Sequence, residues 1–240
     1  SIVLKLPPDS LAFALTGAAH ALAQVEAGNA LPRALASSFE TMRASGAARG
    51  AIQDLSYRSL RHWGRGRALL ALLTDKPVQQ ARLHSLLCSA LALLSETEPA
   101  YSEHTLVDQT VTACGADREL AKAKGLVNAV LRRYTRERQD LLQQLQGDET
   151  AQWNYPRWWI NKARELWPAQ WQFQTCVDHH KAKSLPDHLG DQKAPQNLKF
   201  WMLARPFQPL LVCVVLGAEW RPTNPCVAVG KCRGAHCQKH

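Results

Sequence analysis

Nine lysine and arginine side chains fall into two clusters whose chemistry suits the binding of phosphate. The first cluster is Arg58, Arg61, Arg65 and Arg67, and the second is Lys122, Lys124, Arg132, Arg133 and Arg136. A guanidinium group is planar and presents a fork of donors that pairs with phosphate and stacks on nucleobases. The two clusters therefore predict a surface that binds nucleic acid. A merely solvated helical face is the alternative that spacing alone leaves open.

The overall charge of the chain agrees with an anionic partner. The 240 residues carry a net charge of +9, and 46% of them are apolar, which is enough to build a folded core. Positive charge favours nucleic acid or a membrane surface without choosing between them. The apolar stretch at 210–216 is shorter than the ~20 residues that span a bilayer, and residues 1–8 lack the core of a signal peptide. We expect no membrane segment and a reducing, cytoplasmic location, because the seven cysteines show no disulfide framework spacing.

A 3.6-residue apolar period over residues 9–146 predicts an all-α domain. Asp9 or Ser10 is suited to cap the first helix, and Gly28 to end it. The run Gly64-Arg65-Gly66 predicts a break after a helix that ends near Trp63. A second helix is predicted over 31–42, and further helix starts at Thr74 or Asp75, at Pro99 and at Asp117.

The last of these helices is predicted to carry the second basic cluster on one side. At 100° per residue its apolar residues gather on the opposite side, namely Leu120, Val127, Val130, Tyr134, Leu141 and Leu145. One face should pack against the domain, while the basic face meets solvent or phosphate.

Residues 147–171 change in character and predict a linker followed by the start of a second small helical unit. The segment is rich in aromatic residues, Trp153, Tyr155, Trp158, Trp159, Trp167 and Trp171. Tryptophans can stack on unpaired bases, but we interpret Trp158, Trp159 and Trp167 as the core of this unit. Residues 172–240 lose all periodicity and predict an irregular tail.

The run at 124–133, KGLVNAVLRR, resembles the K-G-x-[IV]-N-[AG]-V-L-R helix of NusB-like RNA-binding domains. It is most similar to this helix in the NusB-like domain at the N-terminus of the bacterial 16S ribosomal RNA cytosine-5 methyltransferases. Blocks at 51–61 (AIQDLSYRSLR), 104–111, 155–159 and 167–171 match that family in the same order. The resemblance implies a NusB-like helical bundle over 9–146 that binds RNA through the two basic clusters.

Beyond residue 171 the resemblance ends. The family would continue with a catalytic domain that binds S-adenosylmethionine, and residues 172–240 contain no glycine-rich loop of the required spacing. We therefore expect no cofactor and no methyl transfer from this chain alone. Our hypothesis for the end of the resemblance is a change of reading frame near residue 172. Pro225-Cys226 lacks the surroundings of a nucleophile. The spacing of Cys226, Cys232, Cys237 and His240 does not match a zinc site.

The function that these observations predict is docking of RNA, in particular small-subunit ribosomal RNA, by the N-terminal region of such an enzyme. Two alternatives stay open at this stage. One is a NusB-like role in protein interaction and transcription antitermination, which implies a protein partner. The other is a remnant without function.

Overall fold

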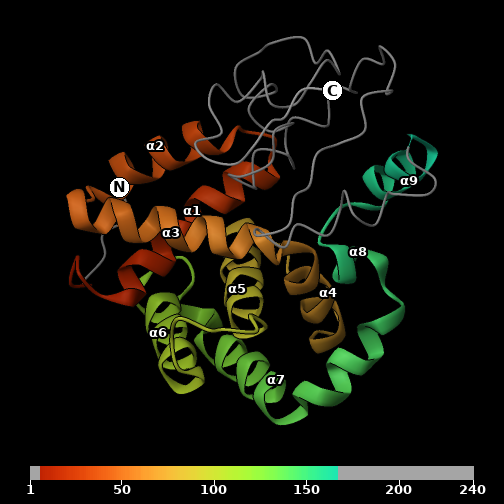
Figure 1. Ribbon diagram of the computed structural model, residues 1–240. Coiled ribbons are helices and arrows are strands. Elements are labelled where there is room, and N and C mark those ends of the chain that lie inside the picture. The colour runs from red at the N-terminus through yellow and green to blue at the C-terminus, as the bar shows by residue number, and fades with distance from the viewer. Residues whose placement is uncertain (1–5, 167–240) are drawn as a thin grey trace. The chain divides into compact units, whose positions relative to one another are not determined.

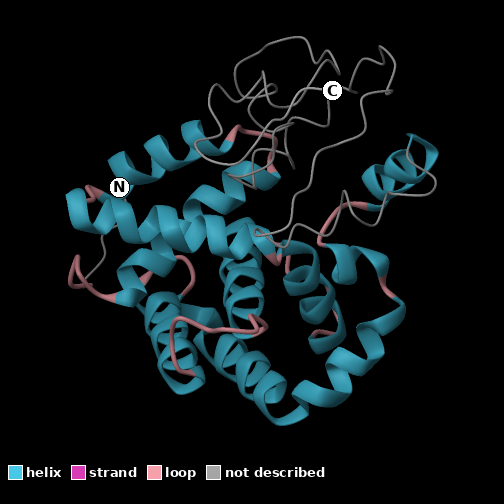
Figure 2. Ribbon diagram, in the orientation of Figure 1, coloured by secondary structure: helices cyan, strands magenta, loops and turns pink. Residues whose placement is uncertain are grey.

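The computed structural model describes residues 6–166. The tryptophans at 167 and 171 lie outside them, and so does the predicted irregular tail 172–240 with its cysteines. Within the described residues every regular element is helical and no strand occurs, as Figure 2 shows. The all-α prediction is confirmed. The elements are α1 (Leu11–Glu26), α2 (Leu31–Met42), α3 (Gly46–Arg61), α4 (Trp63–Leu73), α5 (Ala81–Leu94), α6 (Glu103–Ala116), η1 (Ala121–Ala123), α7 (Lys124–Gln144), η2 (Leu145–Gly147), α8 (Glu149–Trp153) and α9 (Arg157–Leu166).

Helix α5 is the centre of the bundle. All of its residues from Ser85 to Leu94 are buried, because α1, α3, α4, α6 and α7 all pack around it. Figure 1 shows α5 between α3 above it and α7 along the lower edge. A helix that is apolar nearly all round is typical of such a central position. No described helix is long and apolar enough to cross a membrane.

The first two helices have their predicted extents, and α1 begins and ends where its capping residues predict. The Ser10 hydroxyl accepts the Phe13 N–H at 3.1 Å, which satisfies one of the free amides at the start of α1. Gly28 has φ of +98°, a conformation that suits glycine and ends the helix. Arg43 ends α2 with φ of +50°, without a glycine.

The break between α3 and α4 lies at His62, and the prediction that it falls at Gly64-Arg65-Gly66 was wrong. Both glycines lie inside α4, where they allow other backbones to approach. A Cβ at Gly66 would lie 2.5 Å from the Cys88 carbonyl oxygen of α5, and one at Gly64 would collide with the Thr150 carbonyl of α8. These glycines therefore serve helix packing rather than a turn.

Three predicted helix starts also differ from the structure. Thr74 ends α4 by donating its hydroxyl to the Leu70 carbonyl, and α5 begins only at Ala81. Ser102, not Pro99, caps α6. Asp117 follows α6 and accepts the Glu119 N–H, so it organises the turn before η1 instead of capping α7. In each case a local side-chain hydrogen bond favours the turn over an earlier helix.

Helix α8 attaches the aromatic segment to α4. Asp148 caps α8, and Asn154 ends it with φ of +57°. Asn154 Oδ1 also accepts the backbone N–H of Arg65 at 2.9 Å. The prediction that Trp158 is a core residue was wrong, because its side chain is 37% exposed. The buried side of α9 carries Trp159 and Ile160 instead. Trp159 is buried and stacks on Tyr155 with 4.1 Å between ring centroids.

Candidate nucleic-acid interface

The first basic cluster is partly embedded in the bundle and lies beside acidic residues, of which Glu96 is buried. Arg58, near the end of α3, lies 3.8 Å from Glu96 and 3.9 Å from Asp54. Glu96 follows α5 and is only 7% exposed. Burial raises the pKa of its carboxyl, while the positive charges of Arg58 and Arg61 act in the opposite direction. Arg58 and Arg61 thus compensate a carboxylate that folding brings beside them.

Arg65 and Arg67 belong to α4, and the break at His62 separates them from the two arginines of α3. The first cluster is therefore divided between two helices. The Arg65 guanidinium donates to the Ser95 carbonyl at 3.4 Å, which holds it against the end of α5. Arg67 lies 3.8 Å from Glu26, the last residue of α1.

Glu26 is the acceptor of a polar network among α1, α4 and α5. Its carboxylate accepts the indole N–H of Trp63 at 3.2 Å, and His84 Nδ1 lies 3.0 Å away. Burial raises the pKa of Glu26, but the hydrogen bonds and charges of His84, Arg67 and Trp63 outweigh it and leave the pKa below its ordinary value. Arg67 therefore takes part in a network that stabilises the bundle.

The second basic cluster lies on the outward side of η1 and α7. Lys122, Lys124, Arg132 and Arg136 are exposed. Of the five residues Arg133 alone forms an ion pair within the described residues, with Glu137 at 2.9 Å. Arg132 donates to Asn128 Oδ1 on the same helix at 2.9 Å. The side chain of Lys124 lies beside Gly115 of α6. Unlike the first cluster, this one faces solvent.

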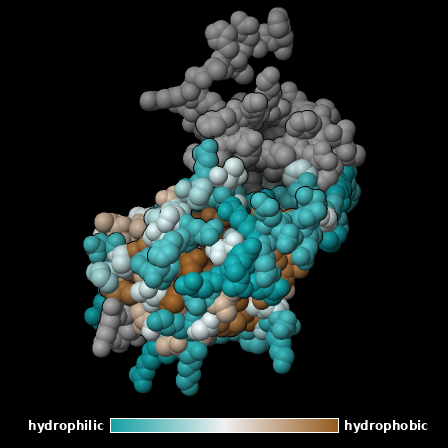
Figure 3. Space-filling model, turned by 90° about the horizontal axis from the view of Figure 1, so that it is seen from below, coloured by the Kyte–Doolittle hydropathy of each residue, from teal (hydrophilic) through white to brown (hydrophobic). Residues whose placement is uncertain are grey.

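The second cluster lies on the side of α7 that faces away from the bundle. The inward side of α7 carries the fully buried side chains of Val127 and Tyr134, and helical geometry places Arg132 and Arg136 on the opposite side. Figure 3 views the molecule from the side where α7 lies, and this face is mostly hydrophilic with small apolar patches. The periodicity of α7 correctly predicted which of its sides is buried.

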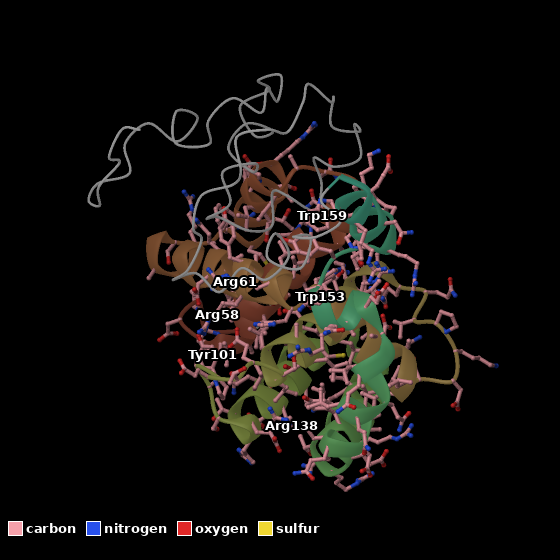
Figure 4. All side chains as sticks on the ribbon, turned by 45° about the vertical axis from the view of Figure 1, so that its right-hand side comes forward. Arg58, Arg61, Tyr101, Arg138, Trp153 and Trp159 are labelled. Carbon is pink, nitrogen blue, oxygen red and sulfur yellow. The ribbon has the colours of Figure 1, made fainter. Side chains whose placement is uncertain are left out.

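Arg138 and Tyr101, which are outside the predicted site, lie near the first cluster (Figure 4). Arg138 of α7 follows a kink at Glu137 and lies 3.9 Å from Glu103, and the buried Tyr134 hydroxyl is close to both Arg138 and Arg65. Figure 4 shows Arg61, Arg58 and Tyr101 in succession, with Arg138 below them and Trp153 across from them. The basic run at 132–138 could have indicated Arg138. Nothing in the sequence around Tyr101 indicates its position.

The described residues offer little to covalent or metal chemistry. Cys88 and Cys114 are buried free thiols. Burial raises the pKa of Cys114 to about 11 and that of Cys88 well above its ordinary value, so neither forms the reactive thiolate at neutral pH. No group of three or more potential metal ligands occurs within residues 6–166. The geometry suits binding through arginine and lysine.

Comparison with known proteins supports this interpretation. The sequence profile of the NusB family matches residues 14–136. The protein from Pseudomonas putida named ribosomal RNA small subunit methyltransferase B is 36% identical over 127 residues, which are 52% of this chain and 28% of that protein. A protein of the same name from Vibrio vulnificus is 31% identical over 169 residues, 69% of this chain and 38% of its own length. The chain thus spans well under half the length of these relatives.

Proposed function

The chain belongs to the NusB family, and from that premise we propose that its helical domain docks small-subunit ribosomal RNA through the outward side of η1 and α7. The observation that carries the proposal is the exposed second cluster, in which Arg133 alone has an acidic partner within residues 6–166. The names of the similar proteins, which state a small-subunit ribosomal RNA methyltransferase, support the choice of RNA.

The physical basis of the docking is neutralisation of phosphates. Exposed cations release the counterions condensed on nucleic acid when they contact its backbone, which makes the affinity depend steeply on salt. Arg132 and Arg136 lie one helical turn apart on the same side, so both can reach one RNA backbone. Such contacts read the shape and backbone of structured RNA more than its base edges.

The test is a binding titration with a fluorescent small-subunit ribosomal RNA fragment over a series of salt concentrations. The double variant Arg132→Gln/Arg136→Gln removes two charges from the exposed face and leaves the ion pair of Arg133 in place. If both arginines contact phosphate, the slope of log affinity against log salt should fall by about 1.4 to 1.8.

The matched control is Arg33→Gln/Arg43→Gln. Both of these arginines are exposed, on α2 and at its end, so the control changes the net charge equally. Equal slopes for the two double variants would mean that any attraction is a property of total charge, and would contradict docking on α7. A wild-type chain that is folded but does not bind the fragment would also overturn the proposal.

A further inference from the structure

We propose that a second RNA contact is made by the arginine–tyrosine face, defined as Arg58, Arg61, Tyr101 and Arg138, and that it holds an unpaired nucleotide. A phosphodiester would lie on the guanidinium groups while a base stacks on Tyr101. This inference rests on the proposed function, since both require an RNA partner. It concerns the opposite side of α7 from the docking cluster.

The face is assembled from three parts of the fold that are distant in sequence. Arg58 and Arg61 come from the end of α3, Tyr101 from the connection between α5 and α6, and Arg138 from α7 after its kink. Figure 4 shows these four labelled side chains along one side of the bundle. Tyr101 is partly exposed, so one side of its ring can meet a ligand.

Arg58 and Arg138 of this face are positioned by ion pairs that are longer than hydrogen bonds. The ion pairs of Arg58 with Glu96 and Asp54 are 3.8 and 3.9 Å long, beyond hydrogen-bond range, and so is the 3.9 Å pair of Arg138 with Glu103. Arg82 is different, because it donates to both Asp117 and Glu119 at 2.5 Å. A guanidinium has five N–H donors, so Arg58 retains a fork suited to phosphate.

The combination of arginine with an aromatic ring favours single-stranded RNA as the occupant. Bases in a duplex are stacked on one another, whereas an unpaired base can stack on a side chain. Glu96 and Glu103 offset part of the positive charge, so this face neutralises few phosphates. Its binding should therefore depend on stacking and on the arginine fork, and only weakly on salt.

The experiment compares two probes on the full chain, a short single-stranded oligouridine and a blunt RNA hairpin whose loop is replaced by a non-nucleotide linker, so that it has no unpaired base. Tyr101→Ala should weaken binding of the oligouridine about tenfold, whereas Tyr101→Phe, which keeps the ring, should bind as the wild type does. Arg58→Lys keeps the charge but loses the fork and should also weaken the oligouridine. All three variants should bind the hairpin normally.

The outcomes separate this inference from the proposed function. Hairpin binding that is lost only in Arg132→Gln/Arg136→Gln, together with oligouridine binding that is unchanged in Tyr101→Ala, would overturn the arginine–tyrosine face and leave docking on α7 intact. Displacement of the hairpin but not of the oligouridine by free phosphate would support the stacking contact. The proposal would be contradicted if the chain bound oligoglutamate but not oligouridine, and if Tyr101→Ala and Arg58→Lys lost the binding of oligoglutamate. That result would show that the face binds an acidic protein.

Discussion

The two basic clusters use the same residue types in opposite ways, and the difference lies in what the fold places beside them. Arg58 and Arg67 face Glu96 and Glu26, which are drawn into the bundle by helices distant in sequence. Within residues 6–166, Arg132 and Arg136 form no ion pair, and both remain exposed. Residue type alone therefore does not separate a cation that balances a nearby carboxylate from one that faces solvent.

The glycines beside the two clusters differ in how closely neighbouring residues approach them. Gly66, beside the first cluster, touches the backbone of α5 so closely that an added Cβ would lie 2.5 Å from the Cys88 carbonyl. Gly125, beside the second cluster, has nothing within 4 Å of that position. The first region is built for close packing, while the second is an open surface.

The largest effect is expected from Gly66→Ala. The methyl group meets rigid backbone and must push α4 away from α5, so we expect the free energy of unfolding to fall by about 3 kcal/mol. Urea denaturation monitored by circular dichroism measures this. A loss below about 1 kcal/mol would show that the first region packs more loosely than the structure has it.

Glu26→Gln should have an intermediate effect that depends on pH. The substitution weakens charged hydrogen bonds to Trp63 and His84, and we expect a loss of about 2 kcal/mol at pH 7. Because folding lowers the pKa of Glu26, its stabilisation is present above the ordinary value of 4.5 and is lost as the pH falls through the lower folded pKa. The difference between variant and wild type should therefore shrink in acid.

The control for this experiment comes from the second cluster. Glu137 pairs with the half-exposed Arg133 one turn away, so Glu137→Gln should change the free energy of unfolding by about 0.5 kcal/mol or less. If Glu26→Gln and Glu137→Gln had equal effects, the contrast between a partly buried network and a half-exposed ion pair would fail.

The smallest effect is expected from Gly125→Ala. Alanine is the better helix former and finds open space here, so the variant should be more stable by about 0.5–1 kcal/mol. Thermal unfolding of the variant beside Gly66→Ala measures the opposite signs directly. A destabilised Gly125→Ala would mean that this part of α7 is covered by other residues of the chain.

Local signals in the sequence predicted much of the fold. Ser10 and Gly28 marked the ends of α1, and apolar periodicity identified both the extent of α2 and the buried side of α7. The position of the break before α4 could not be predicted, because Gly64 and Gly66 are required by contacts with α8 and α5 that are distant in sequence.

The candidate site was only partly accessible from sequence for the same reason. The exposed stripe on α7 follows from the helical period, since it depends on one helix alone. The acids beside Arg58 and Arg67, and the positions of Tyr101 and Arg138 near the first cluster, depend on tertiary packing. Residue type and spacing carry no information about such partners.

The central claim is that RNA covers the outward side of η1 and α7, and lysine footprinting tests it most directly. The chain is treated with an amine-acylating reagent with and without a small-subunit ribosomal RNA fragment, and modification is quantified by mass spectrometry. Lys122 and Lys124 lie in the second cluster, while Lys76, in the connection before α5, is exposed outside it. We predict that RNA protects Lys122 and Lys124 but not Lys76, whereas equal protection of all three, or of none, would contradict docking at this surface.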